Sequence, residues 1–358
     1  MGSHAPANHP IPTHLTRWYI DTRDLTNSMN PALPLLSTLQ PSEQDTIQRF
    51  HHLKDKHMSL ASNLLKYLFI HRSCKVPWDR ITLSRTAAPH RRPCFIPSPT
   101  LLEEYSSTTT TTVDNPDNPA SNPSSTKKTI PKIEFNVSHQ ASLVALAGTT
   151  ISTAEEELPQ VGIDITCTNE RNPTRDKTKT PRQTFVEYVD IFTEVFSSEE
   201  IRQIKDDVVH LHHHQDQDHK ERKAGKGVED SYRVFYAYWA LKEAYIKMTG
   251  EALLAPWLRQ LEFGNVVAPE PVPRRGERRV GLPYRGVRTT LDKKRVEDVR
   301  VELVAFEEDY LIATAARGAG IGAGSGHGEG GDTWEALREI DIERDVRPCA
   351  EGRCRCLE

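Results

Sequence analysis

The chain has 358 residues, of which 37% are hydrophobic, so it can bury a sizeable core in one large domain or two smaller ones. Its 46 basic and 50 acidic residues leave a formal charge of −4, which argues against a protein that coats nucleic acid, because backbone binding needs a strong basic excess. No apolar run approaches the roughly 20 residues of a membrane helix, and the N-terminus lacks the apolar centre of a signal peptide. We therefore expect a cytoplasmic protein that binds neither nucleic acid nor membranes.

The predicted elements of the N-terminal half begin with a helix, because apolar residues recur at helical spacing from Ser42 to His71 and Ser42 suits the N-cap. The tract at 98–128 is rich in Ser, Thr, Pro and Asn and cannot bury apolar surface, so we expect a disordered insertion there. Two short strands follow, at Ile133–Val137 and Ala141–Ala147, and the residues between them form the predicted turn.

The C-terminal half repeats this order of elements. Its predicted segments are a strand at Val161–Ile165, helices at Phe185–Phe196, Ser198–Asp206 and Tyr232–Thr249, and a hairpin of Val299–Phe306 with Tyr310–Ala316. A long helix followed by a pair of strands therefore occurs twice. We expect an α+β fold built as a pseudo-two-fold pair of similar halves, with a cleft between them.

Polar stretches mark the boundaries of the halves. The predicted organisation is a disordered N-terminus at 1–14, an N-terminal half at 15–158, a C-terminal half at 159–317 with a flexible loop at 206–230, and a Gly-rich linker and tail at 318–358. The flexible loop contains a run of histidines. We interpret this run as polar surface and not as a metal site, because adjacent histidines on a flexible loop have no fixed ligand geometry.

The six cysteines do not follow the pattern of a disulfide scaffold, which favours a reducing compartment. They are Cys74, Cys94 and Cys167, scattered singly, and Cys349, Cys354 and Cys356, close together in the tail. The tail group raises the alternative of a metal or redox site. Because no matching set of His and Cys lies nearby in the sequence, we interpret it as reactive thiols on a solvated tail.

The first candidate for chemistry is Asp164, which interrupts the apolar strand Val161-Gly162-Ile163-Asp164-Ile165-Thr166. A carboxylate on a buried strand is costly unless it is paired or holds a cation. The alternative is an Asp that caps a turn at a strand end. The hexapeptide alone leaves both interpretations open.

The second candidate is the helical face formed by Trp239, Glu243 and Lys247, which are spaced four residues apart. The alternative here is an ordinary surface ion pair from Glu243 to Lys247 beside a core Trp. Several tyrosines flank the motif and indicate a largely covered helix. Covered charges need partners, so the flanking sequence favours a functional interpretation.

Two further motifs suit phosphate recognition. Asn136-Val137-Ser138-His139 occupies the predicted turn, where hydroxyl, imidazole and backbone N–H groups can grip a phosphate. Arg85 and Arg92 lie in a short polar stretch, and the guanidinium fork pairs well with phosphate oxygens. Each motif alone is equally compatible with a solvated turn.

Together these groups have one economical explanation. Two carboxylates can hold Mg²⁺ while water and phosphate oxygens complete its shell, and basic groups can bind the remaining phosphate charge. That set of groups suits transfer from a pyrophosphate. The sequence has neither a Walker loop nor a Rossmann G-x-G-x-x-G motif after a strand.

In this order and spacing, the motifs resemble those of the Sfp-type 4′-phosphopantetheinyl transferases, most closely the broad-range fungal members. The family pattern is an Asn-x-Ser-His turn, a Gly-Ile-Asp strand and a Trp-x-x-Lys-Glu-x-x-x-Lys helix. Here these are Asn136–His139, Gly162–Asp164 and Trp239–Lys247. The similarity runs from Thr16 to Arg317 and implies the pseudo-two-fold fold of the family, with the active site at the interface of the halves.

The resemblance implies transfer of 4′-phosphopantetheine from coenzyme A to a serine of apo acyl and peptidyl carrier domains, with release of adenosine 3′,5′-bisphosphate. Such carriers belong to fatty acid, polyketide and nonribosomal peptide synthases and to a lysine-pathway reductase, so roles in secondary metabolism and lysine biosynthesis are implied. The resemblance also implies a monomeric enzyme that uses Mg²⁺ or Mn²⁺, with coenzyme A as its co-substrate.

The resemblance further implies a role for each matched residue. Asp164 and Glu243 would hold the metal, and Glu243 would also accept the proton of the incoming serine. Lys247 would contact the pyrophosphate, and Lys242 would act nearby as a catalytic group. The coenzyme A phosphates would be bound by Arg85, Arg92, Asn136, Ser138, His139 and Lys247.

One position departs from the family pattern. Bacterial members often carry a second acidic residue two positions after the strand Asp, where this chain has Thr166. The metal would then rest on Asp164, Glu243, pyrophosphate oxygens and water. Two other functions are weighed against catalysis: a binding module for coenzyme A or a carrier, which the intact Asp164, Glu243 and Lys247 disfavour, and a nucleic-acid-binding protein, which the near-neutral charge disfavours.

Overall fold

The computed structural model describes residues 14–27, 32–88, 90–106, 129–151, 159–169, 179–210, 228–251, 255–274, 279–318, 320–322 and 333–358. The predictions for 1–13, for 107–128 and for 211–227 lie outside these ranges. Within the described ranges, none of the helices combines the length and the apolar composition that crossing a lipid bilayer requires.

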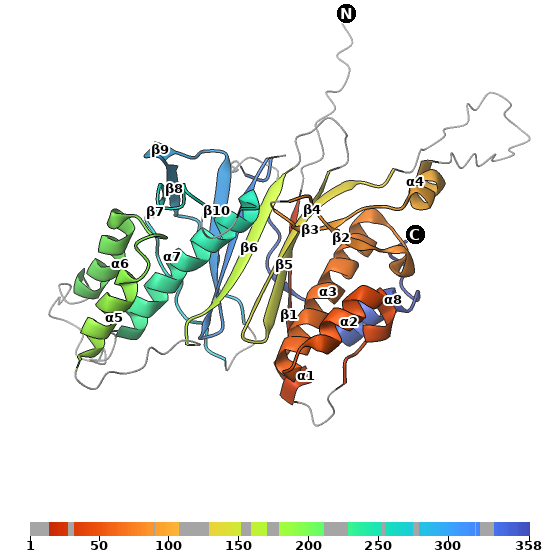
Figure 1. Cartoon of the computed structure of the whole chain (residues 1–358), viewed down its shortest axis with the longest axis horizontal. Coiled ribbons are helices and arrows are strands. Elements are labelled where there is room, and N and C mark those ends of the chain that lie inside the picture. Colours follow the sequence, from red (N-terminus) through yellow and green to blue (C-terminus); the bar gives the residue numbers. More distant parts are fainter. Residues whose placement is uncertain are drawn as a thin grey trace, which may run out of the picture.

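In the N-terminal half, a long helix packs on an antiparallel sheet. The sheet has the order β1 (Leu15–Asp21), β5 (Leu143–Ile151) and β4 (Lys132–Gln140), and the helix is α3 (Leu53–Cys74), as Figure 1 shows. The helix approaches β5 closely at Gly148, where an added Cβ would lie 2.5 Å from the Phe69 ring. Leu60, Leu64 and Leu68 fill the core beneath α3, and all three are fully buried. Their spacing of four residues is the helical periodicity seen in the sequence.

The C-terminal half has the same topology. Its strands β6 (Gln160–Cys167), β11 (Tyr310–Arg317) and β10 (Val299–Phe306) pair in that order, and α7 (Val228–Thr249) packs on β6 and β11. In each half the chain forms a strand, then the long helix, then a hairpin whose last strand lies in the middle of these three. The predicted α+β fold with two similar halves is therefore confirmed.

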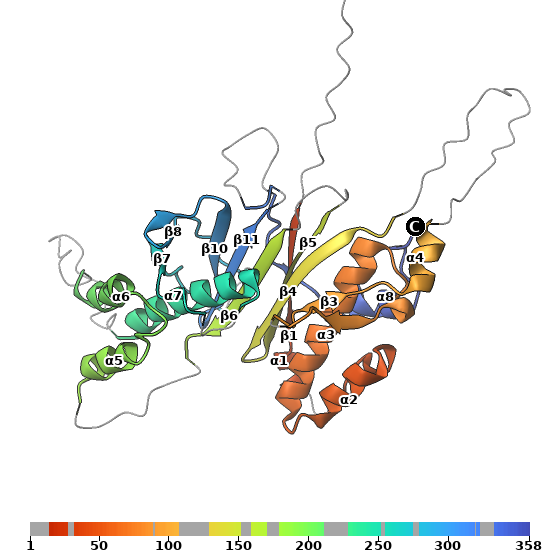
Figure 2. The same ribbon diagram turned by 45° about the horizontal axis from the view of Figure 1, so that its top comes forward.

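Shorter elements surround these two units. They are α1 (Arg23–Asn27), α2 (Pro41–Arg49), β2 (Leu83–Arg85), β3 (Pro93–Phe95), α4 (Pro99–Ser106), α5 (Pro181–Asp190), α6 (Ser198–His210), β7 (Leu261–Gly264), β8 (Arg288–Leu291), β9 (Lys294–Arg295), β12 (Arg338–Glu339), α8 (Arg347–Ala350) and the helical turns Leu36–Thr38, Trp78–Arg80 and Ile342–Val346. Helices α5 and α6 pack beside α7, away from the N-terminal half (Figure 2).

Three local predictions differ from the structure. The helix expected from Ser42 to His71 is broken into α2 and α3, and α2 starts at Pro41, whose fixed φ suits the first helical position. The insertion predicted to be disordered from residue 98 begins with α4, because Leu101 packs into the N-terminal core. The hairpin turn lies at Ala141 and Ser142, which have positive φ, so Asn136–His139 is part of β4 and not of a turn.

The two halves meet along β4 and β6, which belong to different sheets. Side chains join these strands in place of a backbone ladder. Every second residue from Asn136 to Gln140 of β4 accepts a hydrogen bond from a backbone N–H of β6. The three pairs are Asn136 with Ile163, Ser138 with Ile165 and Gln140 with Cys167, at 3.4, 3.2 and 3.1 Å. The strand period of two therefore places three polar side chains of β4 in this seam.

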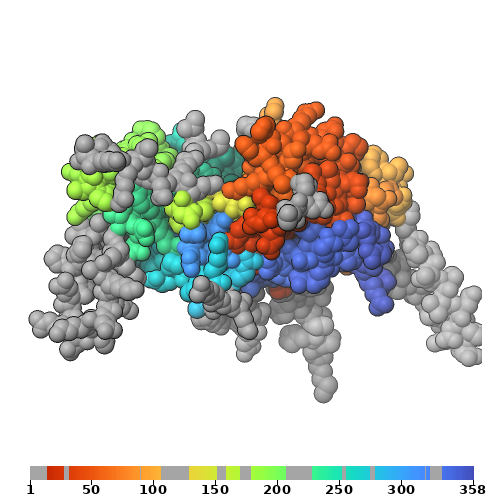
Figure 3. All heavy atoms as spheres, turned by 90° about the horizontal axis from the view of Figure 1, so that it is seen from below, coloured from red at the N-terminus to blue at the C-terminus, as the bar shows by residue number. Residues whose placement is uncertain are grey.

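The C-terminal segment, residues 333–358, packs against the N-terminal half, which corrects the prediction of a solvated tail, whereas most of the predicted Gly-rich linker lies outside the described residues. Its β12 pairs in parallel with β1, and Ile342 and Val346 are buried in the same core as α3. Figure 3 shows this segment in dark blue, lying along the red and orange N-terminal residues. The apolar residues within 333–349 are hard to recognise in the sequence because they follow a Gly-rich stretch and lie among polar residues.

Candidate active site at the seam between the halves

Asp164 lies in the middle of β6, and its side chain contacts groups on β4 and α7. The residue is only 5% exposed, and both carboxylate oxygens accept hydrogen bonds. Ser138 Oγ donates to Oδ1 at 3.1 Å, and Thr166 Oγ1 donates to Oδ2 at 3.0 Å. Because Asp164 is mid-strand, the alternative of a carboxylate that caps a turn at a strand end does not apply.

Lys247 extends from α7 into the same group. Its Nζ lies 2.7 Å from Asp164 Oδ1 and 2.9 Å from Ser138 Oγ. The lysine side chain is 29% exposed, so one side of this ion pair is open to solvent or to a ligand. Three elements, β4, β6 and α7, thus meet at one carboxylate. A bound phosphate oxygen would compete with Asp164 for the Lys247 ammonium group.

Glu243 lies one turn before Lys247 on α7 and is half-buried. Burial raises the pKa of its carboxyl group, the charge of Asp164 raises it further, and Lys247 opposes both. Among the described residues, no hydrogen bond or ion pair holds this carboxylate. Two neighbouring carboxylates that are not fully neutralised attract a cation.

This donor set fits a hard divalent cation. Asp164 and Glu243 supply carboxylate oxygens, the ligands that Mg²⁺ and Mn²⁺ prefer, and neither sulfur nor imidazole is part of the pair. Thr166 supplies no third carboxylate. Its hydroxyl donates a hydrogen bond to Asp164 and orients that carboxylate. One or two carboxylates with water and phosphate oxygens is the usual environment of Mg²⁺ in enzymes that handle phosphate.

Gly162 allows α7 to come close enough for these contacts. A Cβ at this position would lie 2.0 Å from the Ala244 carbonyl oxygen and 2.4 Å from the Met248 backbone nitrogen. Any larger residue would push α7 away from β6 and separate Glu243 from Asp164. The glycine of the Gly-Ile-Asp motif therefore has a packing role that the sequence did not reveal.

His139 lies beside the seam, and a basic cluster forms around it. Partial burial of the imidazole, followed by the charge of Lys247, lowers the pKa of His139, although the residue as a whole is exposed. Lys66, on α3, adds to this effect. Burial lowers the pKa of Lys66 itself to about 8, and the charge of Arg85 acts in the same direction. The structure thus brings His139 and Arg85 into one basic region, and adds Lys66, which the sequence did not single out.

Arg92 and Asn136, both predicted to bind coenzyme A, have partners that connect the two halves. Arg92 forms an ion pair with Glu134, and its Nη2 donates to the Val161 carbonyl oxygen at 2.9 Å, so it links β4 to β6. Asn136 is 7% exposed, and its side-chain oxygen accepts from Ile163 N. Both residues hold the two halves together beside the site.

The structure does not bring Lys242 to the carboxylates, which corrects its predicted place among the catalytic groups. Lys242 is fully buried on another face of α7, because adjacent helical residues differ by about 100° in direction. Its Nζ lies 2.9 Å from a carboxylate oxygen of Glu200 and donates to backbone carbonyls at Leu258 and Leu261. Burial lowers the pKa of Lys242 and raises that of Glu200.

Aromatic residues of α5, of the turn that follows it and of α7 form a small cavity beside the site. It measures about 70 Å³ and is lined by Gln140, Thr166, Cys167, Tyr188, Phe192, Phe235, Tyr236 and Trp239. Trp239 was predicted to share a face with Glu243, and it lies in the wall of this cavity. A second cavity of about 500 Å³, with Arg17 and Trp334 in its wall, contains none of the predicted site residues.

Family models match both halves of the chain. A model described as "4′-phosphopantetheinyl transferase, N-terminal" matches residues 28–108, and one described as "4′-phosphopantetheinyl transferase superfamily" matches residues 160–315. The second match contains Gly162, Asp164, Glu243 and Lys247.

Two fungal proteins match over nearly the whole length, and a human protein matches over a smaller share. The 4′-phosphopantetheinyl transferase A of Aspergillus fumigatus is 52% identical over 388 residues, which cover 100% of this chain and 99% of that protein. The 4′-phosphopantetheinyl transferase NpgA of Emericella nidulans is 52% identical and covers 96% of both chains. The human L-aminoadipate-semialdehyde dehydrogenase-phosphopantetheinyl transferase is 27% identical, over 84% of this chain and 74% of its own.

Proposed function

The chain belongs to the 4′-phosphopantetheinyl transferase superfamily and transfers the phosphopantetheine arm of coenzyme A to carrier proteins, and we propose that it does so at the seam around Asp164. The observation that carries this assignment is the meeting of Asp164, Ser138 and Lys247 from three elements, with Glu243 beside them. In the reaction, the carrier serine Oγ bonds to the β-phosphorus that bears pantetheine. The bond from this phosphorus to the bridging oxygen breaks, and adenosine 3′,5′-bisphosphate leaves.

The chain's own residues have distinct parts in this step. Glu243, whose pKa is raised by burial and by Asp164, is placed to accept the serine proton. Lys247 turns from Asp164 to the pyrophosphate and stabilises the charge that develops on the leaving group. Ser138 and Thr166 keep the Asp164 carboxylate in a fixed orientation.

The metal in this proposal is held by Asp164 and Glu243. When bound there, Mg²⁺ or Mn²⁺ would neutralise pyrophosphate charge. The basic cluster of His139, Lys66 and Arg85 would take the phosphates at the nucleotide end, and the pKa shifts of His139 and Lys66 support their proximity.

We further propose that the acceptors are apo acyl and peptidyl carrier domains of fatty acid, polyketide and nonribosomal peptide synthases and of a lysine-pathway reductase. The similarity to the human protein named for L-aminoadipate-semialdehyde dehydrogenase supports the last of these. We also propose a monomeric enzyme in the cytoplasm, and the six cysteines, none of which forms a disulfide, support a reducing compartment.

The test incubates the protein with coenzyme A, Mg²⁺ and apo carriers from the four pathways, and follows intact mass. Each true acceptor gains the mass of one phosphopantetheine arm. The Glu243→Gln variant should keep most of its affinity for coenzyme A, measured by calorimetry, and lose most turnover, because the base and a metal ligand go while the phosphate contacts remain. Near-normal turnover of this variant would overturn the role of Glu243. Coenzyme A binding without transfer by the wild type would identify a non-catalytic binding module.

A further inference from the structure

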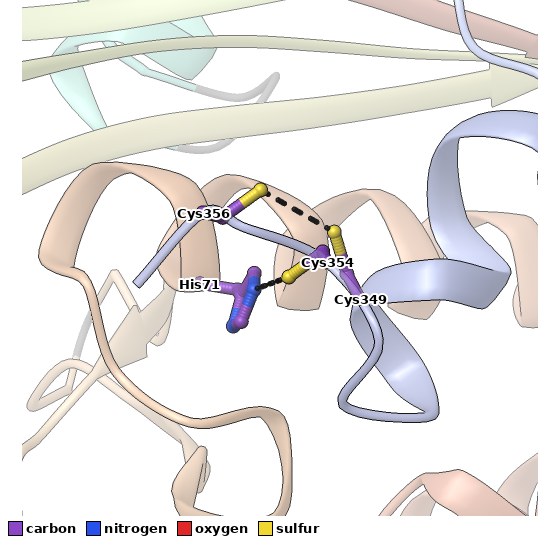
Figure 4. Close-up of side chains that lie close together, drawn as sticks. All are labelled: His71, Cys349, Cys354 and Cys356. Atoms are coloured by element: carbon purple, nitrogen blue, oxygen red, sulfur yellow. Dashed lines mark hydrogen bonds between the residues drawn. The ribbon is translucent and has the colours of Figure 1, made fainter. Parts of the chain in front are cut away.

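Three cysteines of the C-terminal segment converge on a histidine of the N-terminal half. They are Cys349, Cys354 and Cys356, and the histidine is His71 near the end of α3. One ligand atom from each of the four residues lies within 4.8 Å of all the others. Figure 4 shows the His71 ring on its helix and the three sulfur atoms of the C-terminal segment gathered at one place.

The convergence is part of a packed core. His71 and Cys349 are each 1% exposed, and Cys354 and Cys356 are partly buried. Two hydrogen bonds from the end of α3 fix the segment on both sides of the cluster. Arg72 Nη2 donates to the Asp345 carbonyl oxygen at 2.9 Å, and Lys75 Nζ donates to that of Cys356 at 2.6 Å.

The local sequence explains how the three thiols meet. Gly352 has a φ of 68°, a left-handed conformation that glycine adopts without a steric penalty. Its N–H donates to the Cys349 carbonyl oxygen at 3.2 Å, so the chain turns back after α8. Cys354 and Cys356 are two residues apart, and both return to the side of Cys349.

The His71 ring is oriented as a metal ligand requires. Its Nδ1 lies 2.8 Å from the Val76 carbonyl oxygen, and only an Nδ1–H can donate to a carbonyl. This contact fixes the tautomer whose Nε2 carries the free lone pair. That Nε2 lies 3.0 Å from Cys354 Sγ, on the side of the three thiols. A backbone carbonyl that holds the second ring nitrogen is the usual support of a metal-bound histidine.

The sulfur spacing favours a metal over a disulfide. Cys349 Sγ and Cys356 Sγ are 3.7 Å apart, whereas bonded sulfurs lie about 2.05 Å apart. Two sulfurs on a tetrahedral zinc ion, each about 2.3 Å from it, lie about 3.8 Å from each other. A disulfide would also use only two of the three cysteines, and it would leave the third thiol and the His71 lone pair without a role in a nearly closed space.

We propose that His71, Cys349, Cys354 and Cys356 form a closed, structural zinc site. Three thiolates and one imidazole make a complete tetrahedral set with no open position for water or substrate. The ion would fix the end of the C-terminal segment, residues 333–358, which contacts both halves. Within this segment, Glu339 forms an ion pair with Arg279 of the C-terminal half, while β12 pairs with β1 of the N-terminal half. Zinc would thereby stabilise the relative position of the halves on which the seam depends.

The test is the zinc content of the full chain, purified without added metal and measured by elemental mass spectrometry. We expect one zinc per chain. Cys354→Ser and His71→Ala should lose it, whereas His71→Cys, which restores a fourth soft ligand, should retain it. Cys94→Ser and Cys167→Ser are the matched controls and should keep full zinc, since neither residue belongs to the cluster.

A measurement on the wild type keeps the proposal testable if the variants fail to fold. Cobalt added to the zinc-depleted chain should give thiolate-to-cobalt charge-transfer bands and the strong visible absorption of a tetrahedral site. Zinc depletion should also make residues 333–358 the first segment cut by protease. Absence of bound zinc together with weak, octahedral cobalt absorption would overturn the proposal. So would two thiols that resist alkylation until a reductant is added, because that result identifies a disulfide.

Discussion

The seam around Asp164 and the cluster around His71 are both candidate metal sites, and they differ in almost every physical respect. The seam offers two carboxylates, one of them half-buried and without a partner among the described residues. The cluster offers three thiols and an imidazole in a packed core. Hard oxygen ligands with an open side suit an exchangeable Mg²⁺ that meets a substrate, whereas a closed set of soft ligands suits a permanent zinc ion.

The comparison shows how one helix can serve two regions. Lys66 and His71 both lie on α3, five residues apart and therefore on different faces. Lys66 acts on His139 beside the seam, and His71 faces the C-terminal segment. A change at the zinc site should therefore reach the seam only through the position of α3, as a change in stability and not in chemistry.

The largest expected effect separates the two sites by substitution. Asp164→Asn removes the charge of a proposed metal ligand while keeping the shape of the side chain, and we expect transfer to fall by about 10²–10³-fold. Zinc content should remain that of the wild type. Rates come from carrier loading followed by mass spectrometry, and a loss of zinc in this variant would show that the sites are not independent.

Metal removal should also distinguish the two sites, because a chelator should remove the ion at the seam and leave the zinc bound. Brief dialysis against a chelator should stop transfer, and Mg²⁺ or Mn²⁺ alone should restore it, because an open oxygen site exchanges its ion readily. Zinc should remain bound throughout, since all four of its ligands are supplied by the packed chain. Restoration by zinc but not by magnesium would reverse our assignment of the two sites.

The next effect contrasts two lysines of α7. Lys242→Met leaves the Glu200 carboxylate buried without its cation, and we expect a loss of about 3–5 kcal/mol in the free energy of unfolding. Lys247→Met should change stability far less, because this side chain is partly exposed, and should lower the transfer rate. Urea unfolding and carrier-loading rates, measured on both variants, show which lysine contributes to stability and which to the transfer reaction. If Lys242→Met were as stable as the wild type but transferred more slowly, Lys242 would have a catalytic role.

A smaller effect is expected from the helix contact beneath Glu243. Gly162→Ala places a Cβ against the Ala244 carbonyl oxygen, and we expect destabilisation of about 1–3 kcal/mol together with weaker metal binding. Gly264→Ala is the matched control, because its nearest heavy atom, Arg288 Cβ, is 3.9 Å away. If both variants lose the same stability, Gly162 has no special packing role.

The smallest effect concerns pH. Burial lowers the pKa of Lys66 to about 8, while an unfolded lysine titrates near 10.4, so the unfolded chain binds more protons between these values. The sign of this linkage makes stability rise as pH increases from about 8 to about 10. Lys66→Met should flatten that rise in urea unfolding measured at several pH values, whereas Lys132→Met, at an exposed position of the same half, should not.

The sequence predicted the repeated helix and hairpin because apolar spacing is local information. It also singled out Asp164, Glu243 and Lys247, since a charge within an apolar strand or a covered helix is visible in the sequence itself. It misplaced Lys242 because only the fold shows that Glu200 occupies the space on that face of α7. The tail was misjudged for a similar reason: the fourth ligand, His71, lies near the other end of the chain.

The most direct test of the central claim counts manganese bound at the seam in the presence of coenzyme A, by electron paramagnetic resonance. We predict one Mn²⁺ per wild-type chain and none in the Asp164→Asn, Glu243→Gln double variant, while both proteins keep their zinc. Wild-type Mn²⁺ binding by the double variant would contradict the assignment of these two carboxylates as the metal-holding residues of the transferase.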